Sequence, residues 1–207
     1  QYGDPVDILE SGYVRFYELL GFIPKTISNF TKNVEMIFNK KRDLLIVVGG
    51  GSLPPQLYDR PHEDELQPNR DRMEEQVIHY CVAHGIPIIA TCRGMQYINV
   101  MFGGKLWYHP KLPVNRTRGV DHQVWLVKEQ RNIWVNNYHS DCIYEEGLAS
   151  CFEPLAIDRE NHVVEAYGSD EMKILALQWH PERRFETANA YEETRKIILD
   201  FIQKYVK

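Results

Sequence analysis

The stretch of sequence that decides the fold is Pro87-Ile88-Ile89-Ala90-Thr91-Cys92-Arg93-Gly94-Met95-Gln96. Its apolar run before Cys92 is short and rich in β-branched residues, which is typical of a buried strand. Residues 93–102 then have the pattern of a helix that ends at Gly103-Gly104. Cys92 is therefore predicted to lie at a sharp strand-to-helix corner, the arrangement known as a nucleophile elbow.

A cysteine at such a corner is well placed for nucleophilic chemistry. The turn raises its sulfur above the sheet, and the first N–H groups of the helix point toward the group that the sulfur attacks. The helix N-terminus also favours the thiolate, which is the nucleophilic form. A buried cysteine with only a packing role is the alternative for Cys92 when it is considered alone.

A partner for this cysteine is found near the end of the chain, in Leu177-Gln178-Trp179-His180-Pro181-Glu182. Residues 174–179 are predicted to form a strand that ends at His180, and Pro181 forces a turn that lets Glu182 face back. A cysteine nucleophile needs an imidazole to take its proton, and the imidazole needs an acceptor that fixes its tautomer. A surface histidine before a helix-capping glutamate is the alternative for this segment alone. Together with the elbow, the segment 177–182 predicts a catalytic triad of Cys92, His180 and Glu182.

Helical segments and apolar strands alternate along the first half of the chain. This order predicts an α/β fold with a doubly wound, mostly parallel sheet flanked by helices, to which β-like segments after residue 122 add a small β element. Catalytic groups in such sheets lie at the carboxyl ends of strands, where both Gly49–Gly51 and Cys92 are expected. The expected helices cover 6–20, 31–39, 71–83, 93–102 and 185–205, and the expected strands of the first half cover 22–27, 44–48 and 88–91.

Three glycines, Gly49-Gly50-Gly51, follow the apolar run 44–48 directly. Backbone without Cβ atoms can approach a ligand closely and point N–H groups at it, although a flexible turn after a strand is the simpler interpretation. The chain has no Gly-x-Gly-x-x-Gly and no Gly-Lys-Ser, so dinucleotide and P-loop sites are not indicated. Beside a cysteine elbow, the triplet predicts an oxyanion hole with N–H groups from Gly50 and Arg93.

Composition narrows the class of protein. The chain has 207 residues, a net charge of −5 and no apolar run of membrane-spanning length, so we expect a single domain, residues 1–207, that binds neither nucleic acid nor membrane. No signal peptide is visible in residues 1–9. The four cysteines contain no Cys-x-x-Cys pair, which favours a reducing compartment, here the cytoplasm, and argues against a zinc site.

Residues 105–120 contain lysines and arginines but no acidic residue, in a chain that is acidic as a whole. A solvated basic loop is one interpretation. The other is recognition of a phosphate or carboxylate on the substrate, with Arg116 and Arg118 as the candidate residues. The preceding loop, residues 52–70, is rich in proline and long enough to be a lid or a binding loop.

Four segments of the chain resemble the class I glutamine amidotransferase family: residues 85–96, residues 177–182, the glycine loop after Val48, and Val135-Asn136-Asn137-Tyr138-His139-Ser140. They come in the family's order and span most of the chain. The chain is most similar to the stand-alone γ-glutamyl hydrolase branch, because Arg93 follows the cysteine and Arg70-Asp71 opens the preceding helix. Ala90 stands where many amidotransferases have glycine.

This resemblance implies a role for each matching residue. Cys92 would be the nucleophile, His180 the acid–base and Glu182 its orienting partner, with Gly50 and Arg93 as oxyanion donors. Cys92 would attack a γ-carbonyl and release an amine, and water would hydrolyse the thioester to glutamate. No metal or organic cofactor is implied. The substrate contacts implied by the resemblance are Gly51, Gln96, and the segment Tyr138, His139, Ser140 and Asp141.

Two features stay open at this point. The family begins with an apolar strand that residues 1–4 do not provide, and we expect this sequence to start after that strand. The leaving group is the second open feature; the basic loop suits a small, anionic one, for which the bacterial capsule-pathway hydrolases of γ-glutamyl-CDP-amidate offer a similarity, with a cytidine diphosphoramidate as product. The alternatives are a γ-glutamyl-γ-aminobutyrate hydrolase, a glutaminase subunit that feeds a separate synthetase partner, and a binding protein with an inactive triad.

Overall fold

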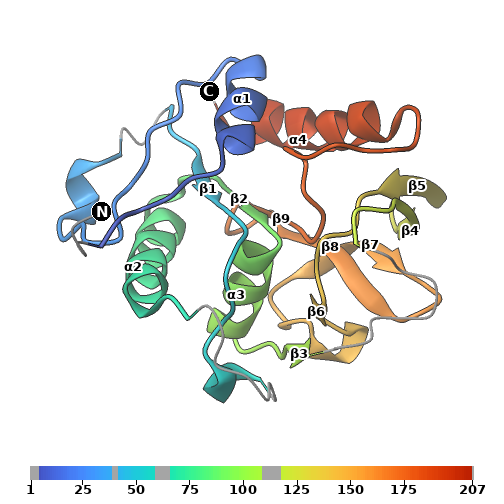
Figure 1. Ribbon diagram of the computed structural model, residues 1–207, viewed down its shortest axis with the longest axis horizontal. Coiled ribbons are helices and arrows are strands. Elements are labelled where there is room, and N and C mark those ends of the chain that lie inside the picture. The colour runs from blue at the N-terminus through green and yellow to red at the C-terminus, as the bar shows by residue number, and fades with distance from the viewer. Residues whose placement is uncertain (1–4, 39–41, 59–65, 109–117, 207) are drawn as a thin grey trace.

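The computed structural model describes residues 5–38, 42–58, 66–108 and 118–206 (Figure 1). Its main sheet has seven strands in the order β1-β2-β9-β8-β7-β4-β5, and a second, two-stranded sheet pairs β3 with β6. The strands are β1 (Leu45–Val47), β2 (Ile88–Thr91), β3 (Trp107–Tyr108), β4 (His122–Leu126), β5 (Arg131–Val135), β6 (Asp141–Cys142), β7 (Glu153–Asp158), β8 (Val163–Ser169) and β9 (Ile174–Leu177). The helices are α1 (Ser11–Leu19), α2 (Pro68–His84), α3 (Arg93–Met101) and α4 (Ala190–Tyr205), with 3-10 turns η1 (Val34–Met36), η2 (Pro55–Leu57) and η3 (Glu145–Gly147).

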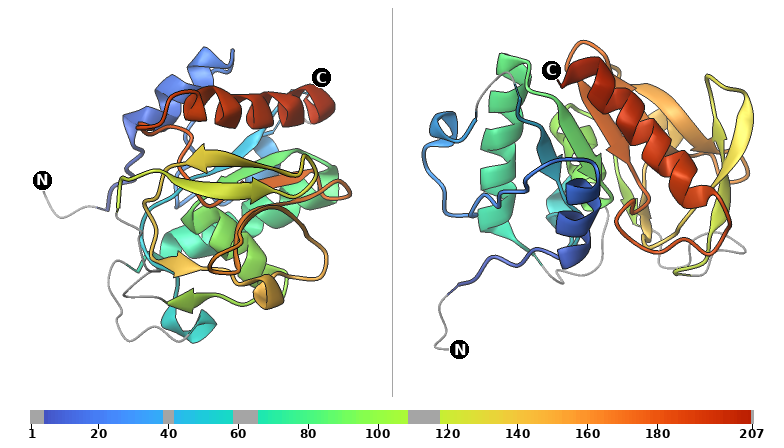
Figure 2. Two further views of the ribbon diagram at one scale, coloured as in Figure 1. Left: turned by 90° about the vertical axis from the view of Figure 1, so that its right-hand side faces the viewer. Right: turned by 90° about the horizontal axis from the view of Figure 1, so that it is seen from above.

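Helices cover both faces of the main sheet, which confirms the α/β class and the doubly wound arrangement. Successive side chains of β2 point to opposite faces of the sheet. Ile88 and Ala90 pack with α2 and α3 in one hydrophobic core, whereas Ile89 packs with α1 and α4 in the other. Figures 1 and 2 show α1 and α4 together on one side of the sheet. The chain between residues 44 and 101 therefore forms the β-α-β-α unit that the apolar runs predict.

The added β element is larger than the small one predicted. Only β1, β2 and β9 pair in parallel, whereas β8, β7, β4 and β5 extend the sheet through antiparallel pairs. Short connections explain three of these pairs, β4–β5, β7–β8 and β8–β9, because hairpins join antiparallel neighbours while parallel strands need a long crossover. The three hairpin turns contain residues with positive φ that are not glycine, Gln130, His162 and Lys173, so they lack the Asn-Gly type of signal that identifies a hairpin in a sequence.

The N-terminal region departs most from prediction. Residues 22–28 form no strand, because Pro24 removes a backbone donor and the segment has no neighbour in the sheet. The helix expected over 31–39 is only the 3-10 turn η1 within the described residues. Helix α2 begins at Pro68, three residues before the predicted start, since proline is favoured in the first turn.

The parallel part of the sheet places three chain segments at one edge. The carboxyl ends of β1, β2 and β9 lie side by side, because the register pairs Val47 with Ala90 and Thr91 with Leu177. The residues that follow these strands are the glycine triplet, Cys92 and the segment that leads to His180. The fold thus brings together segments that are far apart in the sequence, at the edge where α/β enzymes hold their ligands.

Candidate active site

Cys92 occupies the corner between β2 and α3 in a strained backbone conformation. Its φ is 52° and its ψ is −109°, a region that residues with a Cβ atom rarely adopt. Two main-chain hydrogen bonds hold this conformation: the Cys92 N–H donates to the Leu177 carbonyl at 2.7 Å, and the Cys92 carbonyl accepts from the Gln96 N–H at 3.0 Å. The predicted elbow is therefore present, with the cysteine partly exposed at the first turn of the helix.

His180 and Glu182 form a short, buried pair after β9. Nδ1 of His180 lies 2.6 Å from Oε1 of Glu182, and the Glu182 side chain is fully buried. The main chain of His180 is held on both sides by Asn136, whose Oδ1 accepts from the His180 N–H at 2.9 Å and whose Nδ2 donates to the His180 carbonyl at 2.8 Å. Asn136 is fully buried, and sequence reasoning assigned it no role of its own.

The imidazole of His180 also lies near Cys92, because His180 Cε1 and Cys92 Cβ are both within 3.5 Å of the position that a Cβ atom on Gly49 would take. Burial lowers the pKa of His180, but the charge of a Cys92 thiolate, its hydrogen bond to the ring, and Glu182 together raise that pKa to about 9. An imidazolium between a thiolate and a carboxylate is the arrangement that activates a cysteine nucleophile. The structure thus brings together the three side chains of the predicted triad.

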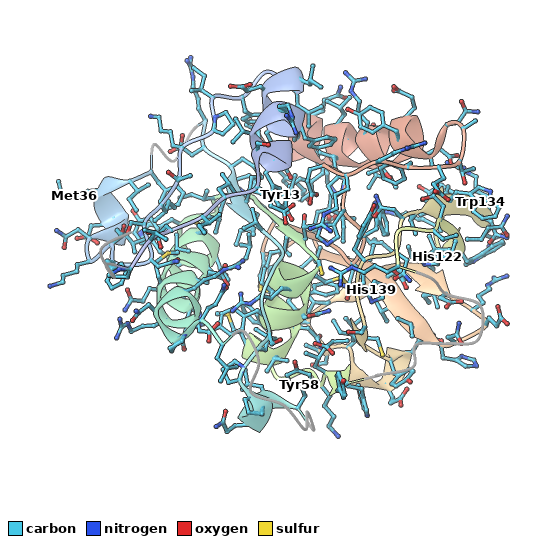
Figure 3. The ribbon with its side chains drawn as sticks, in the orientation of Figure 1. Tyr13, Met36, Tyr58, His122, Trp134 and His139 are labelled. Carbon is cyan, nitrogen blue, oxygen red and sulfur yellow. The ribbon has the colours of Figure 1, made fainter. Side chains whose placement is uncertain are left out.

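Tyr13 of α1 is a member of this cluster that sequence reasoning missed (Figure 3). Its hydroxyl accepts a hydrogen bond from the Gly49 N–H at 2.9 Å and lies within the electrostatic influence of Glu182. Burial, and then the charge of Glu182, raises the pKa of Tyr13, so the hydroxyl stays protonated. No local pattern marks this residue, because its partners lie 36 and 169 residues away in the chain.

The glycine triplet follows β1 and lies against these side chains. A Cβ atom on Gly49 would come within 2.8 Å of His180 Cε1 and 3.5 Å of Cys92 Cβ, so only glycine fits there. Gly50 and Gly51 have φ values of 92° and 73°. Within the described part of the chain, the amides of Gly50 and Arg93 donate to no partner, which leaves both N–H groups available to an oxyanion.

The predicted substrate-binding segment is joined to α3 one turn beyond Cys92. Nε2 of Gln96 donates to the Asp141 carbonyl and to Gln178 Oε1, both at 3.1 Å. Nδ1 of His139 lies 3.1 Å from the same carbonyl, and the ring of Tyr138 meets the ring of His180 edge-on at 5.6 Å. Ser140 is exposed. Gln178 is a further polar residue of this site, to which the sequence analysis assigned no role of its own.

The predicted anion-binding residues are only partly covered by the structure. Arg116 lies outside the described residues, and Arg118 is exposed. The next residue, Gly119, donates its N–H to the Asn137 carbonyl at 2.6 Å, which ties this turn to the segment that carries Tyr138. The basic segment therefore ends beside the candidate site.

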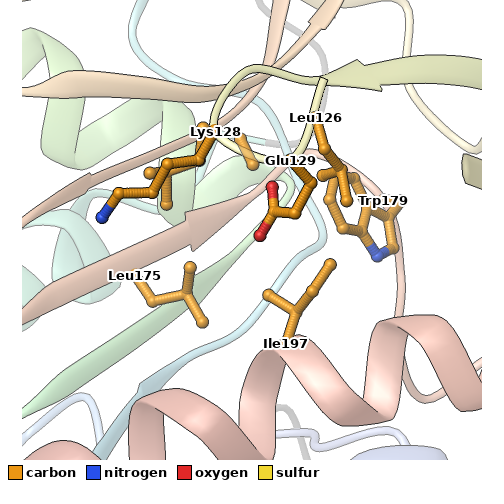
Figure 4. Close-up of a pocket in the computed structure, with 8 residues that line it drawn as sticks. Leu126, Lys128, Glu129, Leu175, Trp179 and Ile197 are labelled. Atoms are coloured by element: carbon orange, nitrogen blue, oxygen red, sulfur yellow. The ribbon is translucent and has the colours of Figure 1, made fainter. Parts of the chain in front are cut away.

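A separate hollow lies on the α4 face of the sheet, between α4 and the β4–β5 hairpin (Figure 4). Its walls are mainly apolar, and none of the predicted site residues lines it. The lining residues are Leu126, Lys128, Glu129, Leu155, Ala166, Leu175, Trp179 and Ile197.

Among the described residues, no group of three His, Cys, Asp or Glu side chains is arranged to hold a metal ion. No helix of the described ranges is both long enough and apolar enough to cross a membrane.

Comparison with known proteins gives matches over most of the chain. The family model of peptidase C26 matches residues 3–182. Protein NtpR of Enterococcus hirae is 28% identical over 202 residues, which cover 87% of this chain and 83% of that protein. The gamma-glutamyl-gamma-aminobutyrate hydrolase PuuD of Escherichia coli is 26% identical over 175 residues, or 72% of this chain and 67% of PuuD.

A solved structure shows a similar fold. It is that of a candidate GMP synthase component from Thermoplasma acidophilum, with a TM-score of 0.66 and 20% identity, and the match covers 93% of this chain and 88% of that one.

Proposed function

The chain belongs to the peptidase C26 family, and on that premise we propose that it hydrolyses the γ-glutamyl amide bond of a small substrate through a thioester on Cys92. The observation that carries the proposal is the position of His180, which lies near Cys92 and is hydrogen-bonded to Glu182 at the strand edge. The similarity to a γ-glutamyl-γ-aminobutyrate hydrolase supports the γ-glutamyl class of substrate.

The first half of the reaction forms the thioester. The Cys92 thiolate attacks the γ-carbonyl carbon, and the carbonyl electrons move onto oxygen, where the N–H groups of Gly50 and Arg93 receive the developing charge. His180, as an imidazolium, then gives its proton to the amide nitrogen, the C–N bond breaks and the amine leaves. Glu182 accepts the hydrogen bond from Nδ1 and keeps Nε2 directed at the reacting atoms.

The second half regenerates the enzyme. Neutral His180 takes a proton from water, the resulting hydroxide attacks the thioester carbon, and glutamate leaves as the C–S bond breaks to a thiolate. Gln96 and the main chain of residues 138–141 would hold the glutamyl group during both halves, because they lie one helical turn from Cys92 and beside His180.

The leaving group of the proposed substrate is anionic. The basic segment that ends at Arg118 supports this, and both γ-aminobutyrate and a cytidine diphosphoramidate meet the requirement. Glutamate release from γ-glutamyl-γ-aminobutyrate, γ-glutamyl-CDP-amidate and glutamine tests the choice. We expect the anionic conjugates to have the higher kcat/KM, and changing Arg116 and Arg118 together to alanine to raise KM for them alone. Lys128→Ala, on a distant hairpin, is the control.

Glutamine as the best substrate, with stimulation by a synthetase, would replace this proposal by a glutaminase subunit. Glutamate release that persists at the wild-type rate in Cys92→Ala would reject the cysteine mechanism altogether.

A further inference from the structure

We infer that Arg70 and Glu74 of α2 are positioning residues that hold the two amide donors of the oxyanion hole at a fixed separation. The inference rests on the proposed function, and it concerns side chains that do not touch the reacting atoms. The two donors come from different segments, the loop after β1 and the start of α3, and a third element connects them.

Arg70 fixes the glycine loop from behind. Its Nη2 donates to the Val48 carbonyl at 2.6 Å and its Nη1 donates to the Gly50 carbonyl at 3.0 Å. These carbonyls belong to the peptide units on either side of the unit that carries the Gly50 N–H. Because three successive glycines have more backbone freedom than other residues, this loop needs an external restraint, and the planar guanidinium fork supplies two contacts at once.

Glu74 connects this arginine to the residue after the nucleophile. Its Oε1 accepts from Arg70 Nε and its Oε2 accepts from Arg93 Nη1, both at 2.6 Å. Arg93 also binds Asp71, and its side chain is 1% exposed. The Glu74 carboxylate therefore connects Arg70, which binds the glycine loop, to Arg93, which offers the second amide.

The charges of this network point to a role beyond packing. Arg70, Asp71, Glu74 and Arg93 are all largely buried, and burying charges costs free energy that well-packed apolar residues would not cost. The charges sum to zero, and Arg70 uses four of its five N–H groups, since Nη1 also donates to Gln67 at 3.0 Å. Apolar residues could not donate directed hydrogen bonds to two main-chain carbonyls, as Arg70 does.

The test separates the chemical step from binding and from folding. We expect Arg70→Lys, which keeps the charge but not the fork, and Glu74→Gln to lower kcat by roughly 10- to 100-fold with KM within about threefold of wild type, since an oxyanion donor acts in the transition state. Affinity for a γ-glutamyl aldehyde, whose adduct with Cys92 carries the oxyanion, should fall by the same factor as kcat/KM. Affinity for glutamate should not change.

The matched controls are Arg72→Ala and Glu75→Gln, which change exposed charges on the same helix and should behave as wild type. The rate at which iodoacetamide alkylates Cys92 should also stay within about twofold in Arg70→Lys, because alkylation forms no oxyanion. Thermal unfolding verifies that each variant is folded.

Wild-type kcat in both Arg70→Lys and Glu74→Gln would overturn the inference and leave the proposed function standing. Equal losses of aldehyde affinity, glutamate affinity and alkylation rate would also overturn it, since they indicate general disorder of the site. Absence of γ-glutamyl hydrolysis in the unaltered chain would instead overturn the proposed function and the inference with it.

Discussion

At the scale of single residues, the arrangement of Cys92, His180 and Glu182 could be predicted from the sequence because Cys92 directly follows one recognisable strand and the other two come shortly after another. The structure brings the three side chains together, while their chemical roles stay predictions. Tyr13 and Asn136 could not be predicted in the same way, since each acts through hydrogen bonds to residues far away in the chain. Nothing in the local pattern of Tyr13 distinguishes it from an ordinary residue of a helix, and the family-like segment that contains Asn136 assigned that residue no role.

The pH dependence of activity follows from the pKa of His180. This pKa is raised to about 9, so the imidazolium that protonates the leaving amine is present below that pH and is lost above it. We expect kcat/KM to fall as the pH rises through about 9. Glu182→Gln removes a charge that raises the pKa, so its alkaline limb should move to lower pH and kcat/KM should fall by roughly 10- to 100-fold.

Measured pH profiles of kcat/KM for the wild type, Glu182→Gln and the exposed-site control Glu186→Gln check this expectation. An alkaline limb that does not move in Glu182→Gln would show that this carboxylate does not set the pKa of His180.

Tyr13 offers a test with a matched control on the same helix. Tyr13→Phe removes the acceptor of the Gly49 N–H beside the candidate catalytic residues, so we expect a loss of about 1–3 kcal/mol in the free energy of unfolding and a clear fall in kcat. Tyr17→Phe should change little, because the buried Tyr17 hydroxyl has no hydrogen-bond partner among the described residues. Urea unfolding and steady-state kinetics provide the two measurements, and equal effects of the two changes would refute the role of Tyr13.

At the scale of elements, the strand-to-helix corner and the parallel strands were the predictable part of the fold. Apolar runs such as residues 44–48 and 86–91 reveal buried strands, and a cysteine or glycine directly after them marks the carboxyl edge. The antiparallel half was harder to predict, because its turns lack glycine and its strands share no one burial pattern, from alternation in β4 to almost complete burial in β8. Val124 and Leu126 are buried, whereas Trp125 between them stays partly exposed.

The side chain of Asn136 makes the hydrogen bonds that join the end of β5 to the main chain of His180 after β9. Asn136→Ala removes both hydrogen bonds to the His180 main chain and leaves buried polar groups without partners. We expect the free energy of unfolding to fall by about 2–4 kcal/mol, from two such losses of about 1–2 kcal/mol each. Asn132→Ala, which affects only an exposed side-chain hydrogen bond on β5, should cost far less. Similar unfolding midpoints for the two variants in urea would contradict this role.

At the scale of the whole molecule, residues that support the candidate site come from both faces of the sheet. The α2–α3 side carries the Arg70–Glu74–Arg93 network and Gln96, while α1 on the other side contributes Tyr13. Cys92 and His180 lie at the edge between these layers. Sequence reasoning identified the edge, because strand ends are local features, but it could not identify the supporting contacts, because these depend on how helices pack across the sheet.

The central claim is that Cys92 carries the γ-glutamyl group during turnover. The most direct measurement is intact-protein and peptide mass spectrometry after acid quenching of a reaction with γ-glutamyl-γ-aminobutyrate, using Cys92→Ser and Cys151→Ala as comparisons, since Cys151 is the exposed cysteine. We expect a glutamyl adduct on the peptide that contains Cys92 in the wild type and in Cys151→Ala. Hydroxylamine should remove this adduct, as it removes a thioester. In Cys92→Ser, we expect no adduct that hydroxylamine removes as readily. Turnover without any adduct on Cys92, or with the adduct on another residue, would contradict the mechanism.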